Sequence, residues 1–237
     1  MFEYPDQPHA LTSNQKAMTI PELYKIFQEH PVVTTDTRDC PEGSLFFALR
    51  GTTFNGNDFA QKALDAGCAY AVVDDPSLKD LPRMIVVDDA LVALQQLANY
   101  HRRTLETPIL QITGTNGKTT TKELTSAVLA EKFNVLFTLG NFNNHIGVPK
   151  TLLRLRKEHE LAVIETGANH PGEIAELSEI VDPDCGLITN VGKAHLEGFG
   201  SFEGVVHTKG ELYDYLREKP EAFIFLHADN EHLCGIA

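Results

Sequence analysis

The stretch ILQITGTNGKTTTKE, residues 109–123, decides the fold of this chain. Its apolar start predicts a strand at 109–113, and the residues after the glycines predict a helix at 118–132. Gly114 and Gly117 frame the turn between them, where small residues let backbone amides come close to an anion. The helix N-terminus adds partial positive charge at the same point. The stretch therefore predicts a loop that binds the phosphates of ATP or of a close relative.

The individual loop residues fit that chemistry. Lys118 can reach the β- and γ-phosphates, and the Thr119 hydroxyl can ligate Mg²⁺. The loop departs from the general G-x-x-x-x-G-K-[ST] pattern, which requires glycine where this chain has Ile112. The alternative is a glycine-rich turn that binds nothing, which the strand–loop–helix context disfavours. We expect the nucleotide contacts to come from Gly114, Thr115, Asn116, Gly117, Lys118, Thr119 and Thr120.

Outward from this loop, the chain has the pattern of two α/β units. After Thr107-Pro108, predicted strands and helices alternate, which is typical of a mostly parallel sheet with helices on both faces. The shorter elements before it predict a small mixed α/β domain. We expect a flexible tail at 1–18, an N-terminal domain at 19–106 and an incomplete central domain at 107–237. No closing helix is predicted after the last strand, at 222–226, so the central domain is expected to be truncated.

The composition excludes several classes of protein. The 237 residues include 20 lysines and arginines against 33 aspartates and glutamates, a formal charge of −13. Such a chain gains little from the counterion release that drives nucleic-acid binding. The cysteines form no C-x-x-C pair, which predicts reduced thiols. Neither a signal peptide nor an apolar run of membrane-spanning length is present, so we expect a cytoplasmic protein without a membrane partner.

Further segments place polar residues near the predicted ends of parallel strands. Glu165 ends one strand, where a carboxylate can hold Mg²⁺, although a role in a local turn is equally open. His195 follows the next strand and could ligate a metal, but a lone histidine is more often a hydrogen-bonded surface residue. Lys209 lies in a predicted helix, where a lysine is usually solvated. Asn143 and Asn144 belong to a loop that could donate to an anionic or sugar ligand, or simply form a turn.

Taken together, these segments resemble the Mur ligase family. The resemblance covers about residues 19–230 and rests on ITGTNGKTTTKE, LGNFNNHIGVPKTLL, KGELY and the stretch ETGANHPGEIAELSEIVDPDCGLITNVGKAHLEGFGS. In the N-terminal half it rests on TDTRDCPEGSLFFALRGTTFNGNDFAQKALDAGCAYAVV. The GANHPGEIAEL and HLEGFGS segments favour the members that join D-Ala-D-Ala to UDP-MurNAc-tripeptide over the sister ligase that adds the third amino acid.

The resemblance implies an enzyme of peptidoglycan precursor synthesis, an ATP-dependent ligase that forms an amide through an acyl phosphate. Its implied cofactors are ATP and Mg²⁺. Its implied partners are UDP-MurNAc-peptide and D-Ala-D-Ala, and the full-length protein is expected to be a monomer. Family members also have a C-terminal domain that these 237 residues do not include. We therefore expect a fragment that binds nucleotide or UDP-sugar without turnover.

The resemblance also assigns roles to residues. It implies that the domain at 19–106 binds the UDP-sugar, and that Thr37 and Arg38 belong to the loop that receives the uridine diphosphate end of this substrate. Asn143 and Asn144 match a segment that faces the substrate. The implied catalytic residues are Lys118, Lys209 and His195, and the implied metal ligands are Thr119, Glu165, His195 and Lys209. Lys209 matches the lysine that the family modifies to a carbamate, which reverses the solvated interpretation of that residue.

Two functions of other classes stay open. A GTPase-like switch would carry an N-K-x-D motif, and this chain has none. A non-catalytic nucleotide-binding module is opposed by the joint presence of the loop lysine, the strand-end acid, the histidine and the helix lysine.

Overall fold

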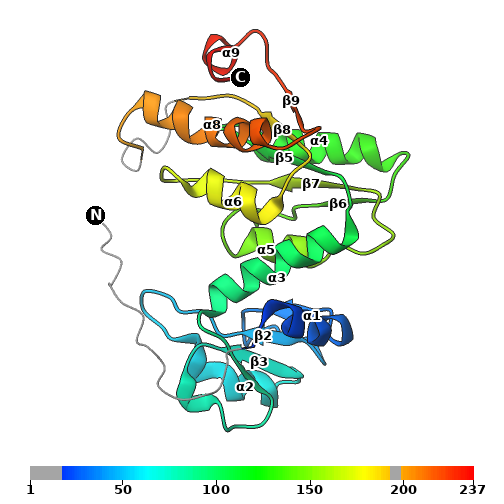
Figure 1. The fold of residues 1–237 in the computed structure, drawn as a ribbon, viewed down its shortest axis with the longest axis vertical. Helices are drawn as coiled ribbons and strands as arrows, with labels where there is room; N and C mark the ends of the chain where they lie inside the picture. The colour runs from blue at the N-terminus through cyan, green and yellow to red at the C-terminus, as the bar shows by residue number, and fades with distance from the viewer. Residues whose placement is uncertain (1–17, 193–198) are drawn as a thin grey trace.

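The computed structural model describes residues 18–192 and 199–237, which contain two parallel sheets (Figure 1). The first sheet has the strand order β1-β2-β3-β4, with neighbouring strands parallel. Its strands are β1 (Val33–Thr34), β2 (Leu45–Phe47), β3 (Tyr70–Val73) and β4 (Met84–Val86). The helical elements of this part are α1 (Ile20–Glu29), η1 (Gly56–Phe59), α2 (Ala60–Asp65), η2 (Pro76–Leu78) and α3 (Ala90–Leu105).

The second sheet has the order β6-β7-β5-β8-β9, again with parallel neighbours. Its strands are β5 (Ile109–Thr113), β6 (Val135–Phe137), β7 (Leu161–Glu165), β8 (Cys185–Ile188) and β9 (Phe223–Phe225). Its helices are α4 (Lys118–Ala130), α5 (Gly147–Leu152), α6 (Glu173–Val181), α8 (Phe202–Glu218) and α9 (Glu231–Ile236). The predicted phosphate-binding loop at 114–120, called the phosphate loop below, follows strand β5. The predicted α/β fold with a parallel central sheet is confirmed.

Helices cover both faces of the second sheet. α4 packs on β5, β6 and β7, while α5, α6 and α8 lie side by side on the other face (Figure 1). Gly186 of β8 lets α8 approach closely, because a Cβ there would come within 2.5 Å of Leu216 Cδ1. This layering leaves the carboxyl ends of the strands free to carry a ligand site.

The helix α3 joins the two sheets through a shared hydrophobic core. It packs against α1 on one side and against α5 and α6 on the other. Leu94 and Leu97 of α3 are fully buried, and their cluster extends from Leu23 of α1 to Leu152 of α5. The first sheet therefore meets the second through buried apolar surface and not through a free linker.

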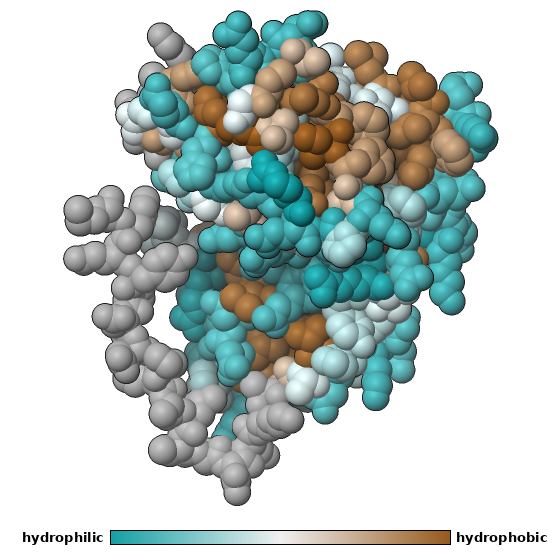
Figure 2. Space-filling model, turned by 45° about the horizontal axis from the view of Figure 1, so that its top comes forward, coloured by the Kyte–Doolittle hydropathy of each residue, from teal (hydrophilic) through white to brown (hydrophobic). Residues whose placement is uncertain are grey.

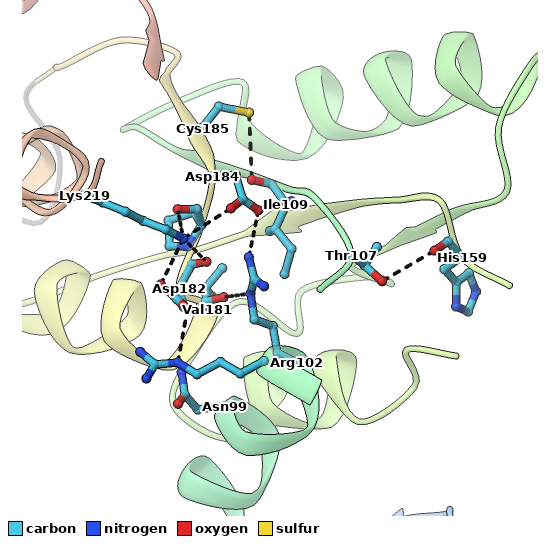
Figure 3. Close-up of polar contacts among 12 residues, drawn as sticks. Asn99, Arg102, Thr107, Ile109, His159, Val181, Asp182, Asp184, Cys185 and Lys219 are labelled. Carbon is cyan, nitrogen blue, oxygen red and sulfur yellow. Dashed lines mark hydrogen bonds and ion pairs between the residues drawn. The ribbon is translucent and has the colours of Figure 1, made fainter. Parts of the chain in front are cut away.

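A polar network fixes the carboxyl end of α3 against the second sheet (Figure 3). The Asp184 carboxylate accepts from Arg102 Nη2 of α3 at 2.7 Å and from the Ile109 amide of β5 at 2.8 Å. Lys219, just after α8, donates to Asp184 at 3.3 Å and also to the Asp182 and Pro183 carbonyls. Asp184 therefore ties together α3, β5 and the end of α8.

We expect Asp184→Ala to lower the free energy of unfolding by about 1 to 2 kcal/mol. The Arg102 side chain is only 6% exposed, so removing its carboxylate leaves a buried charge with one partner fewer. The loss stays below that of a fully buried pair because the Asp184 side chain is 41% exposed. Urea unfolding monitored by circular dichroism measures the change. Asp214→Ala, which removes an exposed pair with Arg217, is the matched control and should cost less than half as much.

One detail of the second unit differs from the sequence prediction. α9 follows β9, although no closing helix was expected there. Its start is capped by Asn230, whose side-chain oxygen accepts from the Leu233 amide at 3.1 Å, and the buried Leu233 packs into the core under α8.

The surface of the second unit carries exposed apolar side chains. Figure 2 shows them gathered over the upper part of the molecule, with a hydrophilic band below. The large exposed apolar residues here include Leu124 and Val128 of α4, Phe223 and Phe225 of β9, and Leu226 directly after β9. None of the helices within 18–192 and 199–237 is long and apolar enough to cross a membrane. All four cysteines are free thiols, as their spacing predicts.

Candidate functional site

The phosphate loop connects β5 to α4, with the strand and the helix start where the sequence predicts them. Gly114 (φ +140°) and Gly117 (φ +78°) adopt backbone conformations that favour glycine. At Gly114 a Cβ would come within 2.1 Å of Thr189 Oγ1, so the position also excludes a side chain sterically. Gly117 is the N-cap of α4, which directs the first amides of the helix toward the loop.

Residues after β8 hold this loop in shape. Thr189 Oγ1 donates to the Asn116 carbonyl at 2.7 Å. Asn190 donates to the same carbonyl at 2.9 Å and accepts from the Asn116 amide at 3.1 Å. Sequence reasoning did not assign Thr189 or Asn190 a role. The available signal was their position after a strand, because residues that follow adjacent parallel strands meet at one edge of the sheet.

Lys118 is half-buried within the loop. Its ammonium group donates to the carbonyls of Gly114 at 2.7 Å and Thr115 at 3.0 Å. Burial lowers the pKa of Lys118, and the nearby charge of Glu165 opposes that shift. The loop thus holds a cation on its inner side, where phosphate oxygens would approach.

Glu165, at the end of β7, lies opposite the first turn of α4. The side chain is buried, and its Oε1 accepts from Thr119 Oγ1 at 3.2 Å and from Asn143 Nδ2 at 2.8 Å. Among the described residues, Oε2 has no hydrogen-bond partner although it is buried. Thr119 is exposed on the α4 side of this pair, and Thr120 is exposed beside it.

These two residues fit a magnesium ion. An unpartnered buried carboxylate oxygen beside a hydroxyl offers the hard oxygen donors that Mg²⁺ prefers. In the described part of the chain, no group of three or more His, Cys, Asp or Glu residues could hold a metal. Mg²⁺ commonly takes only one or two protein carboxylates and completes its shell with water and substrate phosphates, so this sparse set is compatible with it.

The asparagine-rich loop between β6 and α5 borders the same carboxylate. Asn143 donates to Glu165, and its backbone carbonyl accepts from the Gly167 amide at 2.8 Å. Asn144 Oδ1 accepts from the amides of Ile146 at 3.1 Å and Gly147 at 2.9 Å, which forms the turn that leads into α5. The loop therefore combines turn formation with side chains that face the site.

Lys209 is buried in α8, contrary to the solvated alternative for a helix lysine. Its Nζ lies 3.5 Å from the Ala168 carbonyl oxygen and 5.3 Å from the centre of the Phe199 ring. Burial, and after it the charge of Lys118, lowers the pKa of Lys209 to about 8. Two lysines from different helices are thus close enough to repel one another, which favours an anion beside them.

These elements converge on one polar cavity. Its volume is about 440 Å³, and it is lined by Gly114, Thr115, Lys118, Asn141, Asn143, Asn144, His145, Gly167, Ala168, Asn169, Glu173, Phe199 and Lys209. Sequence reasoning singled out the loop, the asparagines and Lys209, but not Glu173 or Phe199. Glu173 is the first residue of α6 and Phe199 lies shortly before α8, so the fold was needed to place them beside the loop.

A larger groove of about 770 Å³ runs between α3, α6 and α8 and shares only His145 with the polar cavity. Its lining is mostly the outer face of α3 and α6 and contains neither lysine of the site. We place the chemistry in the smaller cavity, because convergent charged and amide groups mark a site better than volume does.

Two predicted substrate residues lie elsewhere, and one predicted ligand is outside the described residues. Thr37 and Arg38 follow β1 in the first sheet and do not line the cavity. Arg38 forms an exposed bidentate pair with Asp36, and this pair holds the pKa of the Asp36 carboxyl well below its usual range. His195 lies outside the described residues.

The chain is similar to known ligases in both sequence and structure. A model described as "Mur ligase middle domain" matches residues 112–235, and one described as "Mur ligase family, catalytic domain" matches residues 31–102. The UDP-N-acetylmuramoyl-tripeptide–D-alanyl-D-alanine ligase of Escherichia coli (strain K12) is 46% identical over 198 residues. That match covers 84% of this chain and 43% of the relative.

Solved structures agree. The structure of MurF from Acinetobacter baumannii superposes with a TM-score of 0.80 at 38% identity, covering 86% of this chain and 45% of that one. The MurF ligase from Thermotoga maritima, in complex with ADP, gives 0.74 at 33% identity over 81% and 44%. The chain thus spans less than half the length of these relatives. The middle-domain match alone covers more than half of the chain. The chain therefore belongs to the Mur ligase family.

Proposed function

We propose that this chain carries the UDP-sugar-binding and ATP-binding parts of a cytoplasmic ligase that joins D-Ala-D-Ala to UDP-MurNAc-tripeptide. The observation that carries the proposal is the single cavity that gathers Lys118, the asparagine-rich loop and Lys209 beside the buried Glu165. The relatives named above support the substrate class. The domain roles proposed are UDP-sugar binding for 19–106, with Thr37 and Arg38 at the diphosphate end, and ATP binding for 107–237.

The chemistry has two steps. A carboxylate oxygen of the tripeptide attacks the γ-phosphorus of ATP, which forms an acyl phosphate and releases ADP. The amine of D-Ala-D-Ala then attacks the acyl carbon, phosphate leaves, and the amine gives up a proton. Phosphoryl transfer of this kind needs charge neutralisation and alignment more than covalent catalysis. We assign neutralisation to Lys118 and the loop amides, and alignment of the acceptor carboxylate to Asn143 and Asn144.

Thr119 and Glu165 are the residues that would hold Mg²⁺, with His195 implied by family resemblance. When bound, the ion would supply positive charge that offsets the negative charge of the phosphates. The protein contributes the fixed direction of the Glu165 carboxylate, because Thr119 and Asn143 both donate to its Oε1 and leave Oε2 to a cation.

Lys209 is proposed to form a carbamate with CO₂. The neutral amine attacks the carbon of CO₂, an N–C bond forms, and a proton goes to solvent. Burial lowers the pKa of Lys209 to about 8, so the neutral amine is more populated near neutral pH than in an ordinary lysine. The product replaces a cation that repels Lys118 with an anion that attracts it.

We expect the Lys209 side chain to titrate with a midpoint of about 8, against roughly 10.4 for a lysine in a model peptide. Burial and the charge of Lys118 lower the Lys209 pKa, while Glu173 and Glu211 raise it. The lowered pKa means that protonated Lys209 dominates below about pH 8 and the neutral amine above it. NMR of ¹³C-lysine-labelled protein measures this midpoint, and Lys209→Arg identifies the signal. A Lys209 midpoint near the model-peptide value of roughly 10.4 would contradict the expectation.

Ligand discrimination tests the proposed function. With Mg²⁺ and a non-hydrolysable ATP analogue present, UDP-MurNAc-tripeptide should bind more tightly than UDP-MurNAc-dipeptide in calorimetry. Preference for the dipeptide would move the assignment to the sister ligase that adds the third amino acid. Failure to bind either nucleotide or UDP-sugar would instead favour a non-catalytic module.

We propose further that the 237 residues bind these ligands without turnover, because the relatives are more than twice as long as the regions that match. A phosphate-release assay with ATP, UDP-MurNAc-tripeptide and D-Ala-D-Ala tests this. Sustained phosphate release that depends on all three substrates would refute it.

A further inference from the structure

A second lysine of α4 is fully buried one turn beyond the phosphate-loop lysine. Lys122 is 0% exposed, although it lies on a helix whose sequence suggests a solvated charge. Its Nζ donates to the Thr138 carbonyl at 2.7 Å, pairs with Glu123, and lies 5.6 Å from the centre of the Phe137 ring. Lys122 thus joins α4 to the end of β6.

Thr138 in turn contacts Glu165, the proposed metal ligand. Its hydroxyl oxygen accepts from the Glu165 backbone amide at 3.0 Å, and its own amide donates to the Val163 carbonyl at 3.1 Å. Thr138 also begins the segment that leads into the asparagine-rich loop. One residue therefore connects Lys122, the backbone of Glu165 and the origin of that loop.

The Glu165 side chain is held by the same two elements that Lys122 joins. Thr119 reaches it from the first turn of α4, and Asn143 reaches it from the loop after β6. A shift of the β6 end relative to α4 would move both donors apart and turn the free Oε2 away from its present direction. Lys122 lies where it opposes that shift.

Stability alone does not explain a lysine at this position. Burying an ammonium group costs several kcal/mol before its partners are counted, and an apolar residue of similar volume is often as stable or more so. A buried charge is therefore better explained by a requirement for position. Hydrogen bonds to a charged donor are also shorter and stronger than neutral ones, which suits a fixed distance between a helix and a strand end.

We propose that Lys122 is a positioning residue for the metal–phosphate site: by fixing the Thr138 carbonyl to α4, it sets the place of Glu165 and of the asparagine-rich loop. This inference rests on the proposed function, because it assigns Glu165 to a magnesium ion. Residues that orient a metal ligand without touching the metal typically change metal affinity by about 10- to 100-fold when replaced.

The test compares Lys122→Met and Thr138→Val with Ser126→Ala in the 237-residue chain. Ser126 is a matched control, since it lies one turn further along the same buried face of α4 and its hydroxyl has no partner among the described residues. The first measurement is the Mg²⁺ concentration at half-maximal binding of a non-hydrolysable ATP analogue. We expect both Lys122→Met and Thr138→Val to raise it about 10-fold or more, and Ser126→Ala to leave it within about twofold.

A second measurement needs neither metal nor nucleotide. Hydrogen exchange of the amides at 138–145 should speed up in Lys122→Met but not in Ser126→Ala. If Lys122→Met does not fold, Thr138→Val decides, because it removes the next contact in the series and keeps the lysine. Unchanged Mg²⁺ midpoints with unchanged exchange in a folded variant would overturn the proposal.

The outcomes distinguish a failure of the proposed function from a failure of the proposed role of Lys122. If the unmodified chain shows no Mg²⁺-dependent nucleotide binding, the proposed function fails and the role of Lys122 fails with it. If the unmodified chain binds as expected and the variants bind with the same Mg²⁺ midpoint, only the role of Lys122 is lost. A weaker fold with an unchanged midpoint also counts against it, since that is the result of a purely structural lysine.

Discussion

A Gly114→Ala chain is expected to stay folded and to lose about 100-fold in affinity for a magnesium-bound ATP analogue. The reason is local. The added Cβ would lie 2.1 Å from Thr189 Oγ1 and 3.1 Å from the Asn190 carbonyl oxygen, at a φ of +140°. Backbone strain of this kind costs about 1 to 3 kcal/mol, and the clash adds to it. The loop can relieve both only by leaving Thr189 and Asn190, which hold the Asn116 peptide in place.

Gly43→Ala is the matched control for that experiment. Gly43 also has a positive φ, of +76°, but a Cβ there would meet nothing closer than 3.8 Å, and it lies in the first sheet region. It should cost stability and leave nucleotide affinity unchanged. Calorimetry of the two variants gives the comparison. Equal affinity of Gly114→Ala and the unmodified chain would show that the loop does not carry the phosphates.

The second large effect is expected for Lys118→Met, which should weaken binding of the ATP analogue by about 10- to 100-fold. This is the range expected when a charge-assisted hydrogen bond of about 1.5 to 3 kcal/mol is lost. Adenosine, which has no phosphates, should bind equally to both chains. Lys118 also repels Lys209, so its removal should raise the Lys209 pKa above about 8.

Lys132→Met is the control for charge alone, since Lys132 is exposed after the end of α4. It changes the net charge by the same amount and should change neither affinity nor the Lys209 midpoint. A loss of adenosine affinity in Lys118→Met would indicate a collapsed loop in place of a missing phosphate contact. An unchanged Lys209 midpoint would show that the two lysines do not share one site.

The strand and the helix that flank the loop could be predicted because each is determined by residues that are close together in the sequence. The strand at 109–113 and the helix start at Lys118 match the structure. Each rests on periodicity and on residues that stop or cap an element, such as Gly117 before α4 and the Thr107-Pro108 pair after α3. The alternation of strands and helices likewise predicted the parallel sheet.

Contacts between distant segments could not be predicted in this way. A lysine in a helix carries no sign of burial, so Lys122 was not singled out, and Lys209 was assigned a role only through family resemblance. Both are buried because the topology brings a strand end or another helix over them. Thr189 and Asn190 similarly act on a loop 74 residues or so earlier in the chain, which only the pairing of β5 with β8 brings near.

Burial and hydrogen bonding distinguish between the roles that the sequence left open for Glu165, Asn143 and Asn144. Glu165 is not an exposed turn former, since it is 1% exposed with one oxygen held by two donors. Asn144 forms the turn before α5, while Asn143 donates to the carboxylate. The roles of Thr37 and Arg38 in binding uridine diphosphate remain predictions, because their loop belongs to the first sheet and lies outside the polar cavity.

Hydrogen exchange with and without a magnesium-bound ATP analogue tests the central claim most directly, because it reports where the ligand binds along the chain. We expect the bound analogue to slow amide exchange at 114–120, at 141–145 and at 165–169. Exchange at 36–39 should not change until a UDP-sugar is added. Protection confined to the groove between α3, α6 and α8, or no protection at 114–120, would contradict the claim.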